Sequence, residues 1–126
     1  MKFVSFLTSD GPTVGLLTPE GVVDLSQAAP RLPRSMKELL VKYGTDLSAV
    51  VRTKRDVAPV PLDKVDLLPL LPDPNKIICI GRNYAAHARE GGAEPLEYPD
   101  IFMRAATSLV AHNKPIIRPQ CSETLD

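Results

Sequence analysis

The sequence predicts an α+β fold, and three observations point to it. Residues 2–24 contain three short runs of β-forming residues separated by turn sequences. Residues 35–53 carry helical patterns, and an apolar run typical of a buried strand follows at residues 76–81. Thirteen prolines among 126 residues, about twice the average share, break the chain into short elements. This pattern argues against a helix bundle.

Residues 2–24 are expected to open a small N-terminal domain as a meander of three strands. The sequence SDGP at residues 9–12 and the sequence TPEG at residues 18–21 are typical of turns. Each turn lies between runs rich in Val, Leu, Phe and Thr. Three short strands fit this pattern best.

Two helices are expected after the meander. Ser35 can cap the first, because its hydroxyl oxygen can accept a backbone hydrogen bond and Glu38 stands at the capping-box position. The helix is expected to stop at Gly44. Its apolar stripe consists of Met36, Leu39, Leu40 and Tyr43. A second helix is expected from Asp46 to Thr53, with Thr45 as its cap.

Residues 61–75 are expected to form an extended, proline-rich arm between the N-terminal domain, residues 1–60, and a second domain, residues 76–126. The arm has too many prolines for a helix and too many Val and Leu residues for a free linker. A short strand is therefore expected within it, around residues 65–69.

The second domain is expected to begin with a strand, KIICIG, at residues 76–81. A continuous apolar run with β-branched residues, followed by glycine, is typical of a strand covered on both faces. A short alanine-rich helix is expected over residues 83–89, ended by two glycines. Two further short strands joined by a loop are expected within residues 101–119.

Charge and composition exclude several classes of function. Fifteen basic and fifteen acidic residues give a net charge of zero, which disfavours binding to nucleic acid or to an anionic membrane surface. The apolar runs are far shorter than the roughly 20 residues that span a bilayer, so we expect a cytoplasmic protein. Cys79 and Cys121 have no partner at disulfide or zinc spacing and are interpreted as reduced thiols.

His87 and Glu90 are the strongest candidates for catalytic residues. They stand three positions apart on the expected helix, so their side chains share one face. A carboxylate that accepts one imidazole N–H raises the basicity of the other nitrogen, which can then take a proton from water. The alternative is a weak ion pair on the surface of a helix end, because this spacing alone is not specific.

The sequence around this pair resembles the fumarylacetoacetate hydrolase family. The residues that carry the resemblance are KIICIGRNYAAHAREGG, then YPDIFMRAATSLVAHNKPIIRP and SETLD, which together span residues 76–126. The family pattern is a strand ending in Gly, then Asn-Tyr, a spacer and His, followed by two further strands and a Ser-containing loop. The resemblance implies that residues 76–126 form the first strands and the lid helix of an incomplete mixed β-roll.

The same resemblance implies an enzyme that cleaves carbon–carbon bonds of β-dicarbonyl acids such as acylpyruvates or fumarylpyruvate. Some family members instead decarboxylate, hydrate or isomerise related keto acids. By this likeness His87 is the base that activates water and Glu90 orients it on a helix that closes over substrate. Arg82, Tyr84 and Arg104 are implied substrate-binding residues. The alternatives are surface ion pairs for the two arginines and packing under the helix for Tyr84.

A magnesium, manganese or calcium ion is implied for the full-length family member, but no metal site is expected on this chain. The family's Glu-x-Glu ligand pair normally follows the residues that match SETLD, and the position of a further carboxylate in some relatives is Ile80 here. Glu94, Glu97 and Asp100 are separated by prolines, and His112 is expected in a loop without other ligands nearby.

The chain is therefore expected to be the N-terminal part of a longer enzyme, inactive alone, that acts on a small keto acid as a homodimer. Strand edges without partners support this expectation, because they favour pairing with further protein. The alternative is a self-associating binding module without catalysis. A metal titration discriminates between the two hypotheses.

Overall fold

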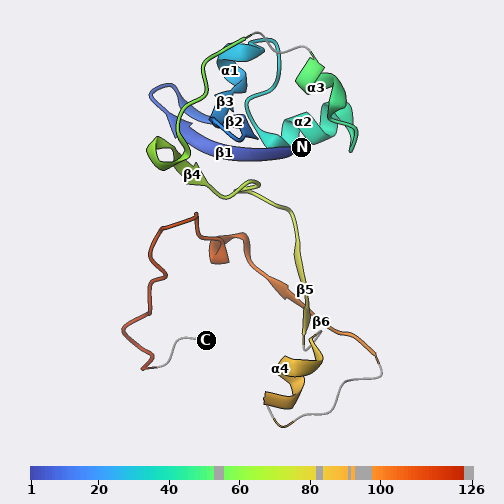
Figure 1. The fold of residues 1–126 in the computed structure, drawn as a ribbon. Coiled ribbons are helices and arrows are strands. Elements are labelled where there is room, and N and C mark those ends of the chain that lie inside the picture. Colours follow the sequence, from blue (N-terminus) through green and yellow to red (C-terminus); the bar gives the residue numbers. More distant parts are fainter. Residues whose placement is uncertain (53–55, 82–83, 91, 93–97, 124–126) are drawn as a thin grey trace. The chain divides into compact units, whose positions relative to one another are not determined.

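The computed structural model describes residues 1–52, 56–81, 84–90, 92 and 98–123. The fold mixes antiparallel strands with short helices, as the predicted α+β class requires. The chain divides into two units, one made of Met1–Pro72 with Val110–Asp126 and the other of Asp73–Leu109. Figure 1 shows the course of the chain through both units.

The first unit contains the predicted meander. Its strands are β1 (Lys2–Thr8), β2 (Gly11–Thr18) and β3 (Gly21–Asp24). A fourth strand, β4 (Asp66–Leu68), completes an antiparallel sheet with the order β3-β2-β1-β4. The strand expected around residues 65–69 is thus confirmed, and its partner is β1.

Three helices follow the meander along the chain: α1 (Leu25–Ala28), α2 (Met36–Tyr43) and α3 (Ser48–Arg52). They pack on one face of the sheet. Register pairs Leu16 with Val23 across two strands of that face, and both side chains are buried. The core cluster joins them to helix residues, and its members are Val14, Leu16, Val23, Leu25, Ala28, Met36, Leu39, Leu47 and Val50.

Helix α2 has the ends that the sequence predicts. The backbone N–H of Glu38 donates to Ser35 Oγ over 3.2 Å, so Ser35 caps the helix. At the other end Gly44 adopts a φ of 66°, a left-handed conformation that favours glycine, and its N–H donates to the Leu40 carbonyl.

Helix α3 begins later than predicted, at Ser48 and not at Asp46. Asp46 Oδ1 accepts the backbone N–H of Ser48 over 3.0 Å, so Asp46 rather than Thr45 supplies the capping oxygen. Hydrogen bonds from the side chain and the backbone of Ser48 lower the pKa of the Asp46 carboxyl. The predicted end at Thr53 lies outside the described residues.

The segment that begins at Val60 adds backbone pairing at the β3 edge of the sheet. Val60 pairs with Val22 of β3 through two backbone hydrogen bonds of 2.8 Å. A 3-10 turn, η1 (Leu62–Lys64), then leads into β4. Ser5 of β1 donates to the Leu70 carbonyl over 2.9 Å, which holds the segment after β4.

The second unit is a two-stranded antiparallel sheet with one helix. Strand β5 (Ile77–Gly81) pairs with β6 (Asp100–Arg104), and α4 (Ala85–Glu90) follows β5 along the chain. A 3-10 turn, η2 (Ala106–Ser108), comes after β6. The strand and the helix expected here are confirmed in kind.

The expectation that β5 is covered on both faces is wrong for this chain. Ile78 and Ile80 are 63% and 53% exposed, and they share a face with Ile101 and Met103 opposite them. Within the described residues β5 has a single strand neighbour, β6, so nothing described shields this apolar face.

The prediction of a second strand within residues 101–119 is also wrong. Residues 114–119 have no regular structure, and Ile116 and Ile117 are 69% and 83% exposed. A strand needs a hydrogen-bonding neighbour, and the described part of the chain offers this segment none.

No helix among the described residues is long and apolar enough to cross a membrane.

Glycine is required at position 15 of β2, because the side chains of Val22 and Phe6 fill the space that a larger residue would need. A methyl group on Gly15 would lie 2.4 Å from Val22 Cγ1 and 2.9 Å from Phe6 Cε1, and both neighbours are buried. We expect Gly15→Ala to lower the free energy of unfolding by about 1–3 kcal/mol, measured by urea denaturation. Adding Val22→Ala should recover part of this loss relative to the sum of the two single changes. Strict additivity would contradict the proposed clash.

Thr13 carries a buried hydroxyl without a hydrogen-bond partner in the described structure. Its residue is 1% exposed. We expect Thr13→Val to raise the free energy of unfolding by about 1 kcal/mol, because it removes an unsatisfied polar group at nearly constant shape. Thr18 is the matched control, since its Oγ1 donates to the Gly21 carbonyl over 3.0 Å. Thr18→Val should destabilise the protein, and equal effects at both positions would refute the argument.

Candidate functional site

The predicted catalytic pair lies on α4, the element that follows β5 along the chain. His87 and Glu90 occupy positions i and i+3 of this helix, so its backbone places both residues on one face. Glu90 is exposed and has an interaction partner. The structure therefore supplies the helix that the acid–base hypothesis requires, and the hydrogen bond between the two side chains stays a prediction.

The end of α4 follows the predicted pattern. Gly92 adopts a φ of 68°, and its N–H donates to the Arg89 carbonyl over 3.0 Å. A left-handed residue at this position terminates a helix, and glycine has no steric cost there. The helix thus ends immediately after Glu90, which leaves the pair in its first and last turns.

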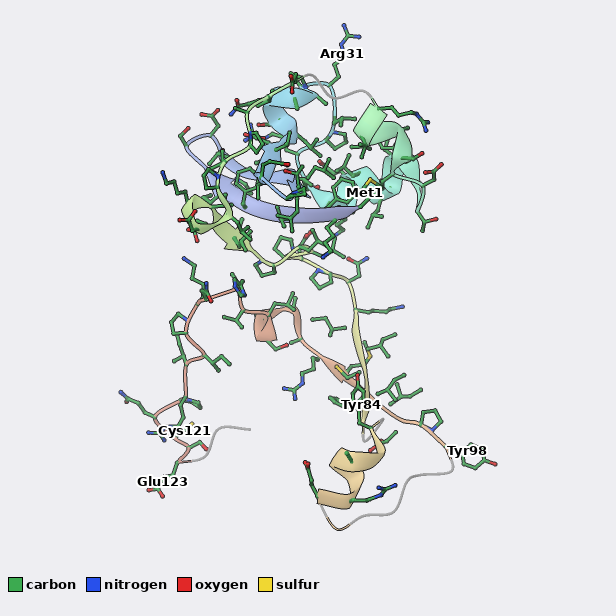
Figure 2. All side chains as sticks on the ribbon, in the orientation of Figure 1. Met1, Arg31, Tyr84, Tyr98, Cys121 and Glu123 are labelled. Carbon is green, nitrogen blue, oxygen red and sulfur yellow. The ribbon has the colours of Figure 1, made fainter. Side chains whose placement is uncertain are left out.

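Tyr84 precedes α4 and is 75% exposed. The alternative that this ring packs under the helix is therefore wrong. Figure 2 shows Tyr84 at the junction between β5 and α4, where a phenol in contact with solvent can meet a ligand. Arg82, another residue that the family resemblance implies in substrate binding, lies outside the described residues.

Strands β5 and β6 form an antiparallel pair, and Arg104 lies at the end of this pair opposite to the end from which α4 follows. It pairs with Ile77, whereas Gly81 at the other end of β5 pairs with Asp100. The two pairs are four positions apart, which corresponds to roughly 13 Å along an extended strand. The Arg104 guanidinium lies 5.7 Å from the centre of the Phe102 ring, a cation–π contact. A substrate that contacted both Arg104 and His87 would have to extend along the β5–β6 pair.

Asp100 is a residue near the site whose position the sequence does not reveal. A methyl group on Gly81 would lie 3.4 Å from Asp100 Oδ2, so this carboxylate stands beside the glycine that ends β5. The antiparallel register brings the start of β6 to the end of β5 from which α4 follows. The strand pairing alone carries this information, since nineteen positions separate the two residues in the sequence.

The described residues do not fit the metal ion that the family resemblance implies. Within them no three His, Cys, Asp or Glu residues gather closely enough to hold a metal. His112 is exposed in a turn, as predicted, and Cys79 and Cys121 are free thiols. Glu94 and Glu97 lie outside the described residues.

Comparison with protein families identifies the segment that follows the proline-rich arm. Residues 76–126 match the family model described as fumarylacetoacetate (FAA) hydrolase C-terminal. These are the residues whose motifs carry the resemblance in the sequence, and the resemblance is confirmed.

The whole chain is similar to curated and solved proteins. It is 36% identical over 131 residues to the oxaloacetate tautomerase FAHD2A, mitochondrial, of Bos taurus, and it covers 42% of that protein. The human protein of the same description is 32% identical with the same coverage. A Mycobacterium smegmatis crystal structure, provisionally assigned as HpcE, matches 85% of this chain and 37% of its own, with a TM-score of 0.66 and 27% identity. The chain thus spans less than half the length of these relatives.

The absence of a ligand cluster among the described residues leads to a prediction about metal binding. Calorimetric titration of the 126-residue chain with magnesium or manganese chloride should show no saturable site, because magnesium requires carboxylates in near-octahedral geometry. A stoichiometric site of micromolar affinity would contradict this expectation.

Proposed function

Because residues 76–126 match the model of the fumarylacetoacetate hydrolase family, we propose that this chain contributes to an enzyme that acts on a small 2-oxo acid through its enol or enolate form. The observation that carries the proposal is the position of His87 and Glu90 on one short helix within the segment that matches the family. The similarity of the whole chain to proteins described as oxaloacetate tautomerases favours a dicarboxylate such as oxaloacetate as substrate.

The proposed chemistry is proton transfer at the carbon next to the keto group. A base removes a proton from this carbon, the electrons of the C–H bond form a carbon–carbon double bond, and the keto oxygen takes up a proton. An imidazole suits this role because its ordinary pKa lies near neutral pH. In this proposal His87 is the base, and the Glu90 carboxylate holds the imidazole in the productive tautomer.

The second candidate is hydrolysis of a carbon–carbon bond in an acylpyruvate or fumarylpyruvate-like acid, with His87 activating water. The description of the matching family model favours it. Both reactions pass through an enolate, whose charge must be stabilised by donors or a cation. A divalent cation, Mg²⁺ or Mn²⁺ or Ca²⁺, is part of the proposal only as an ion held by other residues, because the described ones provide no ligand set.

The remaining features of the proposal concern the helix and the assembly. We propose that α4 acts as a lid, because it is short and ends at a left-handed glycine that can serve as a hinge. Tyr84, Arg82 and Arg104 are proposed to contact substrate. A cytoplasmic homodimer is proposed as the working form, and the exposed apolar face of β5 and β6 is consistent with burial against further protein.

The role of His87 can be tested in the complete protein that contains this chain. We expect His87→Ala to lower kcat for oxaloacetate tautomerisation by about 10²- to 10⁴-fold, the usual contribution of a general base. The ultraviolet absorbance of the enol reports this reaction. Release of pyruvate from an acylpyruvate, measured on the same variant, tests the second candidate. A rate near that of the unmodified protein in both assays would refute the assignment.

The role of Glu90 predicts a smaller effect. Glu90→Gln should lower kcat by about tenfold, because the amide still orients the ring but cannot stabilise its charged form. Arg89→Gln is the matched control, since Arg89 is an exposed neighbour on the same helix without a proposed role. Equal losses in Glu90→Gln and Arg89→Gln would show that the helix tolerates no substitution and would remove the evidence for orientation.

A further inference from the structure

A pocket in the first unit has no part in the proposed reaction. Its volume is about 590 Å³, within the range of pockets that bind small molecules. It lies between the loop after α1 and the last turn of α2, and all of its described lining residues belong to the first unit. The predicted catalytic residues belong to the second unit.

The floor of this pocket is apolar. Ala28 and Ala29 are 0% and 7% exposed, and Leu32 and Tyr43 are half-buried beside them. Leu32 and Tyr43 also pack against the core cluster of this unit. Such a floor favours a ligand with a flat or branched hydrocarbon part, because its burial releases water from both surfaces.

The charged side chains that line the pocket are both cations among the described residues. Lys42 and Arg31 are exposed at its rim, and no described carboxylate lines it. Two positive charges over an apolar floor attract an anion. The ligand is therefore expected to carry a negative group as well as a hydrocarbon part.

Lys42 is placed to meet that negative group. Its Nζ lies 5.4 Å from the centre of the Tyr43 ring, a cation–π contact that holds the ammonium group above an aromatic face. Figure 2 shows Arg31 extending away from its loop, and this side chain is exposed. Lys42 thus places a positive charge at the aromatic part of the pocket wall.

The walls of the pocket are held in place by backbone hydrogen bonds. The N–H of Leu32 donates to the Ala29 carbonyl over 2.9 Å, which closes the loop after α1. The N–H of Gly44 donates to the Leu40 carbonyl over 2.8 Å at the end of α2. A preformed pocket loses less conformational entropy on binding than one that must first be ordered.

We propose that this pocket binds a small amphipathic carboxylate, with the hydrocarbon part on Leu32 and Tyr43 and the carboxylate at Lys42. The site is independent of the proposed reaction, and it gives the first unit a ligand of its own. Aromatic carboxylic acids of the size of benzoate fit the chemistry of the floor and of the rim.

The test is an NMR titration of the ¹⁵N-labelled 126-residue chain with sodium benzoate. We expect saturable shifts of the backbone amide signals of Ala28, Ala29, Arg31, Leu32, Lys42 and Tyr43. Benzyl alcohol, which has the ring without the charge, should bind several-fold more weakly, and acetate should cause no saturable shift. Shifts that do not saturate or that map to other residues would overturn the proposal, as would equal affinity for benzyl alcohol.

Two variants test the role of the charge. Lys42→Gln keeps most of the aliphatic stem and should weaken benzoate binding about fivefold, the effect of one exposed charge pair. Lys64→Gln is the matched control, because Lys64 is exposed in η1 and does not line the pocket. Unchanged affinity in Lys42→Gln, or an equal loss in both variants, would show that the ammonium group at the rim does not select the ligand.

Discussion

The packing of α1, α2 and α3 on one face of the meander is the interaction on which the first unit depends. Val14, Leu16 and Val23 provide the sheet side of this contact, and Leu39 and Val50 are among the fully buried side chains on the helix side. Burying a Val or Leu side chain stabilises a fold by about 1.5–3 kcal/mol. The caps, turns and strand pairs of this unit all act to keep these apolar side chains together.

The second unit lacks such a contact within the described residues. Its two strands are joined by a regular antiparallel ladder, yet Ile78, Ile80 and Met103 are more than half exposed. A two-stranded sheet is at best marginally stable alone in water, since backbone hydrogen bonds exchange with water at little net gain. Among the described residues, the apolar side chains of the segment that carries the family motifs are therefore more exposed than those of the first unit's core. This contrast agrees with relatives more than twice as long as this chain.

The sequence predicted local structure well where a few neighbouring residues decide it. Ser35 and Gly44 specify both ends of α2, because capping and left-handed conformations depend on the residues at those positions. The prediction at Thr45 was wrong, because Asp46 is one position closer and its carboxylate accepts the hydrogen bond better than a hydroxyl. The helix that carries His87 and Glu90 was also predicted from local properties, and the catalytic role of the two residues stays a proposal.

Features that join distant parts of the chain could not be predicted in this way. The pairing of β4 with β1, the position of Asp100 beside Gly81 and the pocket between Ala28 and Tyr43 all depend on strand register or packing. The apolar run of β5 predicted a strand covered on both faces, but Ile78 and Ile80 are exposed, because burial depends on what else is present to cover a strand. The sequence by itself determined the α+β class, the meander of three strands and the helix that carries the histidine. Only the tertiary structure decided which strands pair and which apolar faces are buried, because these depend on contacts between residues far apart in the chain, and hydrophobic burial is non-directional.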